Sequence, residues 1–593
     1  MYTNQKISQV GVNIQEKATV IWNVANSLFG AYKPHEYGLV ILPMVVIKRF
    51  HDCLLPTHDN VVATYKRIKG QGLAVMEPFL LKESRYKFYN ISEYTFEKLK
   101  ADPENIKANF ENYLNGFSDN VIDILAKMDF FTQLDRMANA GLLYQVICDF
   151  CTEKADMSLE KISAVDMGYI FENLVQRFSE SYNEEAGAHF TSRDIIYLMC
   201  DLLTENMAMA EEGHIYTAYD MAMGTSQMLT CMEERLSALD KAAKLICYGQ
   251  EINPFTFGIA KADMLIRGGD PENMQFGDTL SEDKFSGMTF DFIISNPPFG
   301  IDWKREASQV EAENKLGNGG RFAPGLPPKS DGQMLFLLNG IAKLKDTGHM
   351  AIIQNGSSLF TGDAGSGSSE IRRYIIENDW LEAIVQLPND SFYNTGIATY
   401  VWLISKEKKA SRREYVQLID ASKCYVSRRK PIGNKRVDIT LEARNLIVKA
   451  FGEYRDGIYE AEDENGHKLI VKSRILAALS LGYNKVIVES PQLDADGKPV
   501  VKRGKMQADV SKRDSENIPL DEDVDEYLAR EVTPYSPNAW IDHSKDKVGY
   551  EIPFTRTFYE YKTIEDAKDI AERIRRREKE LSDRIHSLFG SED

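Results

Sequence analysis

Between about residue 163 and residue 430, short apolar runs alternate with longer amphipathic stretches, and this alternation limits the possible folds more than any other feature of the chain. The short runs have the length of β-strands, and the stretches between them have helical spacing. This is the pattern of repeated β-α-β units, so we expect an α/β domain built around a mostly parallel sheet. The expected strands are Ile215–Tyr219, Leu245–Tyr248, Phe290–Ile294, Met350–Ile353, Leu381–Gln386 and Thr399–Ser405.

Residues 1–160 lack this alternation. Glycine is sparse there, and apolar residues recur three and four positions apart, which predicts a helical N-terminal domain. The clearest amphipathic stretches are Ile21–Leu28, Leu39–Phe50, Val121–Met128 and Leu142–Phe150.

Residues 431–593 form a C-terminal region that is charged and irregular. We expect a loop or linker over 491–518, where Lys and Asp occur without periodicity. Order returns in a helical tail over 565–590, with one narrow apolar stripe and seven basic residues between 568 and 584. A terminal stripe this narrow suits docking on a partner helix, and packing within its own domain is the alternative. The stripe consists of Ile570, Ile574, Leu581, Ile585 and Leu588.

The charge of the chain sets a condition on any function that involves nucleic acid. It has 71 Lys and Arg residues against 89 Asp and Glu residues, a formal net charge of −18. Such a chain repels phosphate backbones on average, so DNA binding would need a local basic groove or a basic partner. One candidate is the long Gly-rich loop after Phe299, although a merely solvated loop would look the same. Its basic residues are Lys304, Arg305, Lys315, Arg321 and Lys329.

Cysteine content and hydropathy indicate in which cellular environment the protein works. Seven cysteines are too few for a disulfide scaffold, and Cys148 and Cys151 form one CxxC without a second pair, so we expect no metal site. The longest apolar run, Gly38–Ile47, contains Pro43 and is about half a membrane span. We expect a soluble, cytoplasmic protein without a membrane partner.

The tetrapeptide Asn296-Pro297-Pro298-Phe299 is the strongest functional signal. It follows the expected strand Phe290–Ile294, at the edge where open parallel sheets bind ligands. Each proline restrains the residue before it to an extended backbone, so the turn is stiff. Asn296 offers a side-chain carbonyl and Pro297 a backbone carbonyl, while Phe299 offers an apolar ring. A rigid turn that merely ends the strand is the alternative.

Two fixed acceptors beside an aromatic ring suit the exocyclic –NH₂ group of a flipped-out base. The lone pair of such an amine is delocalised into its ring, so acceptors placed for a pyramidal amine favour the reacting geometry. Alignment of this neutral nucleophile with a good electrophile would supply most of the rate. The predicted catalytic residues are therefore Asn296, Pro297, Pro298 and Phe299.

The tetrapeptide and its surroundings resemble the amino-group DNA methyltransferases that use S-adenosylmethionine, and more closely the modification subunit of type I restriction–modification systems. The resemblance covers nearly the whole chain, in the order typical of that family. It implies a Rossmann-like methyltransferase domain over 163–430. The other segments that carry it are Trp22–Phe50, Gly187–Ser192, Asp220–Leu229, Gly249–Glu251, Gly277–Asp278, Asp331–Ile353 and Leu387–Ile397.

The resemblance also implies where S-adenosylmethionine binds. Residues 189–191 stand where the family holds the methionine end of the cofactor, and Thr191–Asp194 reads as a capping box that would offer helix N–H groups to a carboxylate. Glu251 ends the second expected strand, where an acid can accept both ribose hydroxyls. Asp278 resembles the residue that binds the adenine amine of the cofactor. The predicted set is His189, Phe190, Thr191, Asp220, Met223, Gly224, Thr225, Glu251, Asp278 and Asn296.

The loop after the first strand departs from the family pattern. The family usually has Asp-Pro followed by two or three glycines, whereas this chain reads Asp-Met-Ala-Met-Gly-Thr-Ser-Gln over 220–227. Only Gly224 remains, and Ser226 permits a positive φ less readily than glycine. The departure affects the geometry of the loop and its affinity for the cofactor, but it does not by itself indicate an inactive site.

The resemblance implies methyl transfer from S-adenosylmethionine to N6 of adenine in double-stranded DNA. It also implies a specificity subunit, bound by two modification subunits, and an optional nuclease subunit. Three alternatives stay open. The chain could methylate another amine, such as cytosine N4, an RNA adenine or a protein glutamine. It could act on DNA without a partner, or it could be a catalytically silent scaffold of the same fold, which only the altered loop supports.

Overall fold

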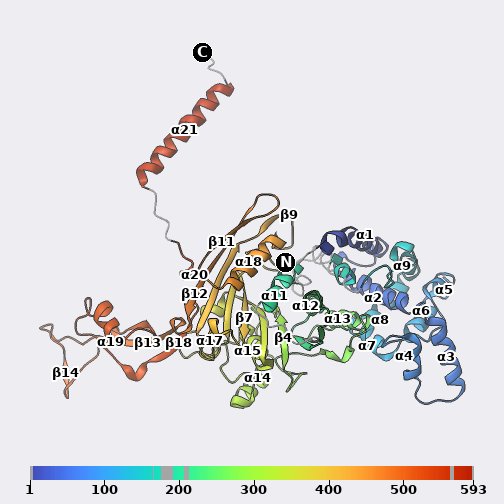
Figure 1. The fold of residues 1–593 in the computed structure, drawn as a ribbon, viewed down its shortest axis with the longest axis horizontal. Coiled ribbons are helices and arrows are strands. Elements are labelled where there is room, and N and C mark those ends of the chain that lie inside the picture. The colour runs from blue at the N-terminus through green and yellow to red at the C-terminus, as the bar shows by residue number, and fades with distance from the viewer. Residues whose placement is uncertain are drawn as a thin grey trace. The chain divides into compact units, whose positions relative to one another are not determined.

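The computed structural model describes residues 5–163, 166–171, 173–174, 191–205, 213–560 and 566–589 (Figure 1). The chain divides into two compact units, Met1–Ile552 and Pro553–Asp593. None of the helices within the described ranges is long and apolar enough to cross a membrane.

A ten-stranded sheet forms the centre of the first unit, in the order β11-β12-β8-β6-β7-β5-β4-β1-β2-β3. The six strands expected from the sequence are present, two of them with identical limits. They are β1 (Ile215–Asp220), β2 (Lys244–Glu251), β4 (Phe290–Ser295), β5 (Leu344–Asn355), β6 (Leu381–Gln386) and β7 (Thr399–Ser405).

The sheet is mixed, and it extends past the expected end of the α/β segment at residue 430. β5, β4, β1, β2 and β3 (Met274–Phe276) are mutually parallel, but β7 runs antiparallel to both of its neighbours. β8 (Tyr415–Lys423) pairs parallel with β6, and beyond residue 430 the chain adds β11 (Gly457–Glu462) and β12 (Lys468–Ala477) in antiparallel pairing. β11 and β12 are partly exposed, so they lack the fully apolar runs of buried strands.

Helices pack on the sheet and on one another. α11 (Arg193–Glu205) and α12 (Gln227–Leu239) pack together, and α11 also packs on α18 (Leu441–Glu453). One apolar core fills the space between these three helices and the sheet. α15 (Gln333–Lys343) packs on β5 and on α17 (Gly367–Glu377).

The N-terminal residues are helical, as expected, but they do not form a core of their own. α13 (Pro254–Ile266), which follows β2, packs on α2 and α7 and contributes Ile259 and Leu265 to their apolar cluster. The helices are α1 (Gln5–Leu28), α2 (Gly38–Leu54), α3 (His58–Gly70), α4 (Glu77–Ser84), α5 (Phe96–Lys100), α6 (Ile106–Asn115), α7 (Asp119–Lys127), α8 (Phe130–Asn139) and α9 (Leu143–Phe150).

The loop or linker expected over 491–518 is wrong at its end, because residues from Asp514 on form a strand of a small sheet. β13 (Gly482–Glu489) pairs with β16 (Asp514–Pro519), β17 (Trp540–Ile541) and β18 (Lys547–Tyr550). Its core is only Val486, Val488 and Ile518, which is too few residues to give a period in the sequence. Within 491–518 a second hairpin joins β14 (Val501–Lys502) to β15 (Lys505–Met506).

The second unit contains the expected C-terminal helix. α20 (Phe554–Thr557) precedes α21 (Ala567–Phe589), whose limits agree with the helix expected over 565–590. The stripe residues Ile574 and Leu581 are each 60% exposed.

Candidate functional site

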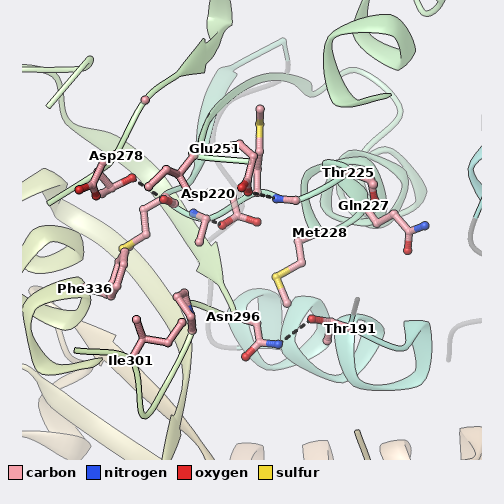
Figure 2. A pocket seen from close by; sticks show the side chains of 18 of the residues that line it. Thr191, Asp220, Thr225, Gln227, Met228, Glu251, Asp278, Asn296, Ile301 and Phe336 are labelled. Atoms are coloured by element: carbon pink, nitrogen blue, oxygen red, sulfur yellow. Dashed lines mark hydrogen bonds between the residues drawn. The ribbon is translucent and has the colours of Figure 1, made fainter. Parts of the chain in front are cut away.

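A cavity of about 210 Å³ lies at the carboxyl ends of β1, β2, β3 and β4 (Figure 2). Parallel strands direct the loops that follow them to this one edge, so residues far apart in sequence meet there. The cavity is lined by Thr191, Ile196, Asp220, Met221, Ala222, Met223, Gly224, Thr225, Gln227, Met228, Glu251, Ile252, Gly277, Asp278, Thr279, Asn296, Pro298, Ile301 and Phe336.

The cavity is acidic. Three acidic side chains line it, those of Asp220, Glu251 and Asp278, and no Lys, Arg or His is among its described lining residues. This arrangement repels the phosphates of nucleotides and favours a ligand with a cationic centre. S-adenosylmethionine, a nucleoside with a sulfonium and an ammonium group, fits this charge.

Asp220, at the end of β1, is almost fully buried, and burial raises the pKa of its carboxyl from 3.8 to about 7. Its Oδ1 accepts hydrogen bonds from the Ser295 hydroxyl at 2.7 Å and from the backbone N–H of Ala222 at 3.1 Å, and both bonds act against the shift. Ser295 is the last residue of β4. The Asp220–Ser295 bond therefore ties the first loop to the strand that leads into the proline corner.

Glu251, at the end of β2, holds the backbone of the first loop. Its Oε2 accepts the N–H of Gly224 at 2.8 Å, and its Oε1 accepts the N–H of Asn253 at 2.7 Å. Glu251 therefore links the first loop to the start of the helix that follows β2.

Two residues of the altered first loop have a left-handed backbone conformation. Gly224 has φ 52° and Ser226 has φ 68°. The sequence indicated that Ser226 would resist such a conformation, but the chain imposes it at the residue just before α12. The loop keeps a glycine-type backbone with one glycine, at a local energetic cost from Ser226.

Asn296 lines the cavity and carries an unpaired acceptor. Its Nδ2 donates to the hydroxyl of Thr191 at 2.8 Å, and this bond fixes the plane of the amide (Figure 2). Its Oδ1 is buried and has no hydrogen-bond partner. A buried carbonyl without a donor is costly, and in a cavity wall it marks a place where a ligand N–H is expected.

The other residues of the tetrapeptide occupy different environments. Pro298 is exposed and lines the cavity beside Asn296, whereas Pro297 is buried. The Phe299 ring is half-buried against the sheet core and is not among the cavity residues. Of the two clamp residues, Asn296 is therefore at the cavity and Pro297 is not among its lining residues, so the roles of Pro297 and Phe299 stay predictions.

Asp278 lines the cavity, but both of its oxygens also stabilise their own turn. Oδ1 accepts the N–H of Leu280 at 2.9 Å, and Oδ2 accepts the hydroxyl of Ser281 at 2.8 Å. The neighbouring Thr279 hydroxyl donates to the carbonyl of Met221 at 2.6 Å and so joins this turn to the first loop.

Thr191 is at the cavity, as expected, whereas His189 and Phe190 lie outside the described residues. The capping box expected over Thr191–Asp194 does not form. The Ser192 hydroxyl has no hydrogen-bond partner in the described structure, and Asp194 instead accepts the ammonium group of Lys435 at 2.9 Å. A tertiary ion pair has replaced the local cap.

The loop after Phe299 is more ordered than its composition suggested, and most of its cations are engaged. It contains α14 (Ala307–Asn314), and Arg321 binds Glu313 and backbone carbonyls. Lys329 pairs with Glu311 at 2.7 Å. Trp303 is buried and donates to the carbonyl of Pro328 at 3.0 Å, so it anchors the loop, as expected.

The sequence did not single out several apolar residues of the cavity wall. Ile252 and Ile301 are each 57% exposed, which is unusual for isoleucine and gives the cavity an apolar rim. Ile252 directly follows the strand-ending acid Glu251, and that adjacency could have identified it. Phe336 on α15 and Met228 on α12 lie in ordinary helical patterns that give no such signal.

Comparison with known proteins gives two family matches along the chain. A family model described as "N-6 DNA Methylase" matches residues 163–473, and one described as "HsdM N-terminal domain" matches residues 18–150. The first match ends within β12, in agreement with the extension of the sheet beyond residue 430.

Individual relatives agree with these family matches. The chain is 25% identical over 464 residues to the type I restriction enzyme MjaIX methylase subunit of Methanocaldococcus jannaschii, covering 75% of this chain and 78% of that protein. It is 30% identical over 258 residues to the HindI methylase subunit of Haemophilus influenzae, covering 43% and 54%. A solved type I methyltransferase subunit from Streptococcus thermophilus superposes with a TM-score of 0.61 at 21% identity, covering 79% of this chain and 97% of that one.

Proposed function

Because the chain belongs to the N-6 DNA methylase family, we propose that it transfers a methyl group from S-adenosylmethionine to N6 of adenine in double-stranded DNA. One observation carries this proposal: Asn296, whose buried Oδ1 has no hydrogen-bond partner, lines an acidic cavity at the carboxyl end of the sheet. An amine donor from one side and a cationic methyl donor from the other would satisfy both features.

The chain's own residues would bind and orient the amine. Asn296 Oδ1 and the carbonyl of Pro297 accept its two N–H groups, and Thr191 keeps the amide of Asn296 from rotating. This holds the nitrogen in the geometry of the transition state rather than conjugated with its ring. Phe299 would stack on the extruded base.

The cofactor, when bound, supplies an electrophilic methyl group on a sulfonium centre. Glu251 would accept the ribose hydroxyls, Asp278 the adenine amine, and residues 189–191 would lie at the methionine end. Asp220, Met223, Gly224 and Thr225 would form the wall of the first loop. The acidic, cation-free cavity supports this assignment.

We further propose the division of the chain and its assembly. Residues 1–160 would be a helical domain, 163–430 the methyltransferase domain and 431–593 a C-terminal region with a partner-binding helix at 565–590; the sheet that continues to Ala477 favours a later end for the second. Two such chains would bind one specificity subunit, which selects the DNA sequence, and a nuclease subunit could join them. This assembly would act in the cytoplasm.

The test is base analysis of duplex DNA after incubation with S-adenosylmethionine and the chain, with and without its specificity subunit. We expect N6-methyladenine at one recurring sequence with the partner present and almost none with the chain alone. N4-methylcytosine instead, or methylation only of RNA or protein, would contradict the proposed substrate. Equal methylation by the chain alone would remove the requirement for a partner.

A catalytically silent scaffold is the remaining alternative. It predicts no cofactor binding by calorimetry, even in the assembled complex. The ordered first loop, held by Glu251 through Gly224, favours a functional cofactor site.

A further inference from the structure

A basic hairpin stands at the same end of the sheet as the proline corner. β9 (Val426–Ile432) and β10 (Lys435–Asp438) follow β8 and pair with each other in antiparallel fashion. Because β8 is parallel to β6, and β6 has the same direction as β5 and β4, the chain leaves β8 at the edge where it leaves β4 for Asn296.

The base of this hairpin is fixed to the residues that support the clamp. Lys435, with a side chain only 2% exposed, donates to Asp194 at 2.9 Å and to the carbonyl of Ser391 at 3.2 Å. The N–H of Ile439 binds the same Asp194 oxygen at 2.9 Å. Asp194 lies in the first turn of α11, three residues after Thr191, which binds Asn296.

The turn of the hairpin is also held against its surroundings. Gly433 has φ 55°, and a Cβ at this position would lie 2.4 Å from the carbonyl oxygen of Tyr393, so only glycine allows this approach. The N–H of Asn434 donates to that carbonyl at 2.8 Å. The hairpin therefore has a defined position relative to the cavity.

The hairpin presents three cations outward. A register shift places the four residues 428–431 opposite Arg436 alone, and this bulge exposes Arg429 and Lys430. Arg429, Lys430 and Arg436 are exposed, and within the described structure no carboxylate lies within 4 Å of them. Arg428 and Lys435 of the same hairpin are paired with acids.

We propose that Arg429, Lys430 and Arg436 bind backbone phosphates of the DNA beside the extruded adenine. The inference rests on the proposed function and adds a surface to it. In a chain with a net charge of −18, three unpaired cations on a fixed hairpin at the catalytic edge supply the local positive field that a duplex requires. In the loop after Phe299, three cations are already paired with acids, which leaves the exposed Arg305 and Lys315 to add to this field; the paired ones are Lys304, Arg321 and Lys329.

The test measures the salt dependence of DNA binding. The hairpin variant Arg429→Gln/Lys430→Gln/Arg436→Gln is assembled with the specificity subunit and titrated with a fluorescent duplex of random sequence over a range of salt concentrations. Loss of three phosphate contacts reduces the magnitude of the negative slope of log K against log salt by about 2.7, at about 0.9 per phosphate. Cofactor affinity, measured by calorimetry, is expected to stay unchanged and reports that the variant is folded.

A matched control removes the same charge elsewhere. Lys498→Gln/Lys502→Gln/Arg503→Gln neutralises three exposed cations around the β14–β15 hairpin, beyond the family match at residue 473. We expect this control to keep the slope of the unaltered protein. A charge-retaining variant, Arg429→Lys/Arg436→Lys, is also expected to keep it, because phosphate attraction needs the charge rather than the guanidinium shape.

The outcomes separate the hairpin from the proposed function. An unchanged slope in the hairpin variant, an equal fall in the control, or no duplex binding by the unaltered complex overturns the hairpin proposal. If the unaltered complex binds duplex with a hairpin-dependent slope but methylates no adenine, the proposed function fails and the hairpin proposal stands. If the unaltered complex methylates adenine and the hairpin variant keeps the slope of the unaltered complex, the proposed function stands and the hairpin proposal fails.

Discussion

At the scale of single residues, the site is built from hydrogen bonds that join neighbouring strand ends. Ser295 binds Asp220, Glu251 binds the backbone of Gly224, and Thr191 binds Asn296. Most of these residues could be predicted from the sequence, because an acid at the end of a strand and a pair of prolines are both visible in a short stretch of sequence. Their partners could not, since each bond spans at least 27 residues of sequence.

Asp220 makes the stability of the protein depend on pH in a specific window. Burial raises the pKa of its carboxyl to about 7 in the folded state, above the ordinary 3.8, so the folded chain holds this proton more tightly than the unfolded chain. Its contribution to stability is therefore complete below about pH 4 and is lost as the pH rises toward 7. In Asp220→Asn this loss is absent.

The readout is the difference in free energy of unfolding between Asp220→Asn and the unaltered protein, from urea titrations without cofactor. All other groups titrate in both proteins, so the difference isolates Asp220. It should grow in favour of the variant by about 1.4 kcal/mol per pH unit between pH 5 and 6.5. A difference that does not change with pH would contradict the buried, proton-retaining carboxyl.

Ser226 offers a test of the altered first loop. Its φ of 68° is unfavourable for a residue with a Cβ, and its side chain makes no capping hydrogen bond to α12. Ser226→Gly should therefore raise the free energy of unfolding by about 0.5 to 1 kcal/mol. The paired change Gly224→Ala, at φ 52°, should lower it by about 1 to 2 kcal/mol.

Thermal unfolding of both variants beside the unaltered chain decides this prediction. Opposite shifts in Tm support a strained but formed loop. Destabilisation by Ser226→Gly would mean that the serine side chain contributes more than its backbone strain costs.

At the scale of helices and strands, the elements that are most buried in the structure were the ones that the sequence predicted best. Strands β6 and β7 are almost wholly buried, and their apolar runs gave both limits correctly. The sheet of β13, β16, β17 and β18 was missed because a core of three residues leaves no long apolar run. Likewise, the ion pair of Asp194 with Lys435 overrode a local capping signal, and only the folded chain brings these residues together.

The apolar stripe of α21 should bind the specificity subunit. Removing residues 565–593 is expected to abolish co-purification of the two chains. A finer variant, Ile574→Gln/Leu581→Gln/Ile585→Gln, should do the same, because burial of such side chains in an interface contributes about 1.5 to 3 kcal/mol each. The measurement is the amount of this chain that co-purifies with a tagged specificity subunit.

The control variant repeats this spacing on the opposite face of α21. Glu572→Gln/Lys579→Gln/Asp583→Asn lies two residues before each stripe position and should leave assembly intact. Assembly that survives the stripe variant, or that fails equally in the control, would show that the stripe is not the contact.

At the scale of the whole molecule, charge is distributed according to the ligand that each surface would meet. The cavity is acidic, which suits a cationic cofactor, while exposed cations gather on the β9–β10 hairpin at the same edge. The net charge of −18 argues against a chain that holds DNA by its overall field. Fold and family followed from the sequence, whereas this placement of opposite charges at one edge required the structure.

The central claim is that Asn296 grips the amine of an extruded adenine beside the cofactor. The most direct measurement is single-turnover methyl transfer to duplex DNA by the complex carrying Asn296→Ala, with cofactor affinity measured on the same preparation. We predict a loss of about 10²- to 10³-fold in the rate of transfer at saturating cofactor, as for removal of one hydrogen-bonding group that acts on the transition state. Methyl transfer at the rate of the unaltered complex would contradict the claim.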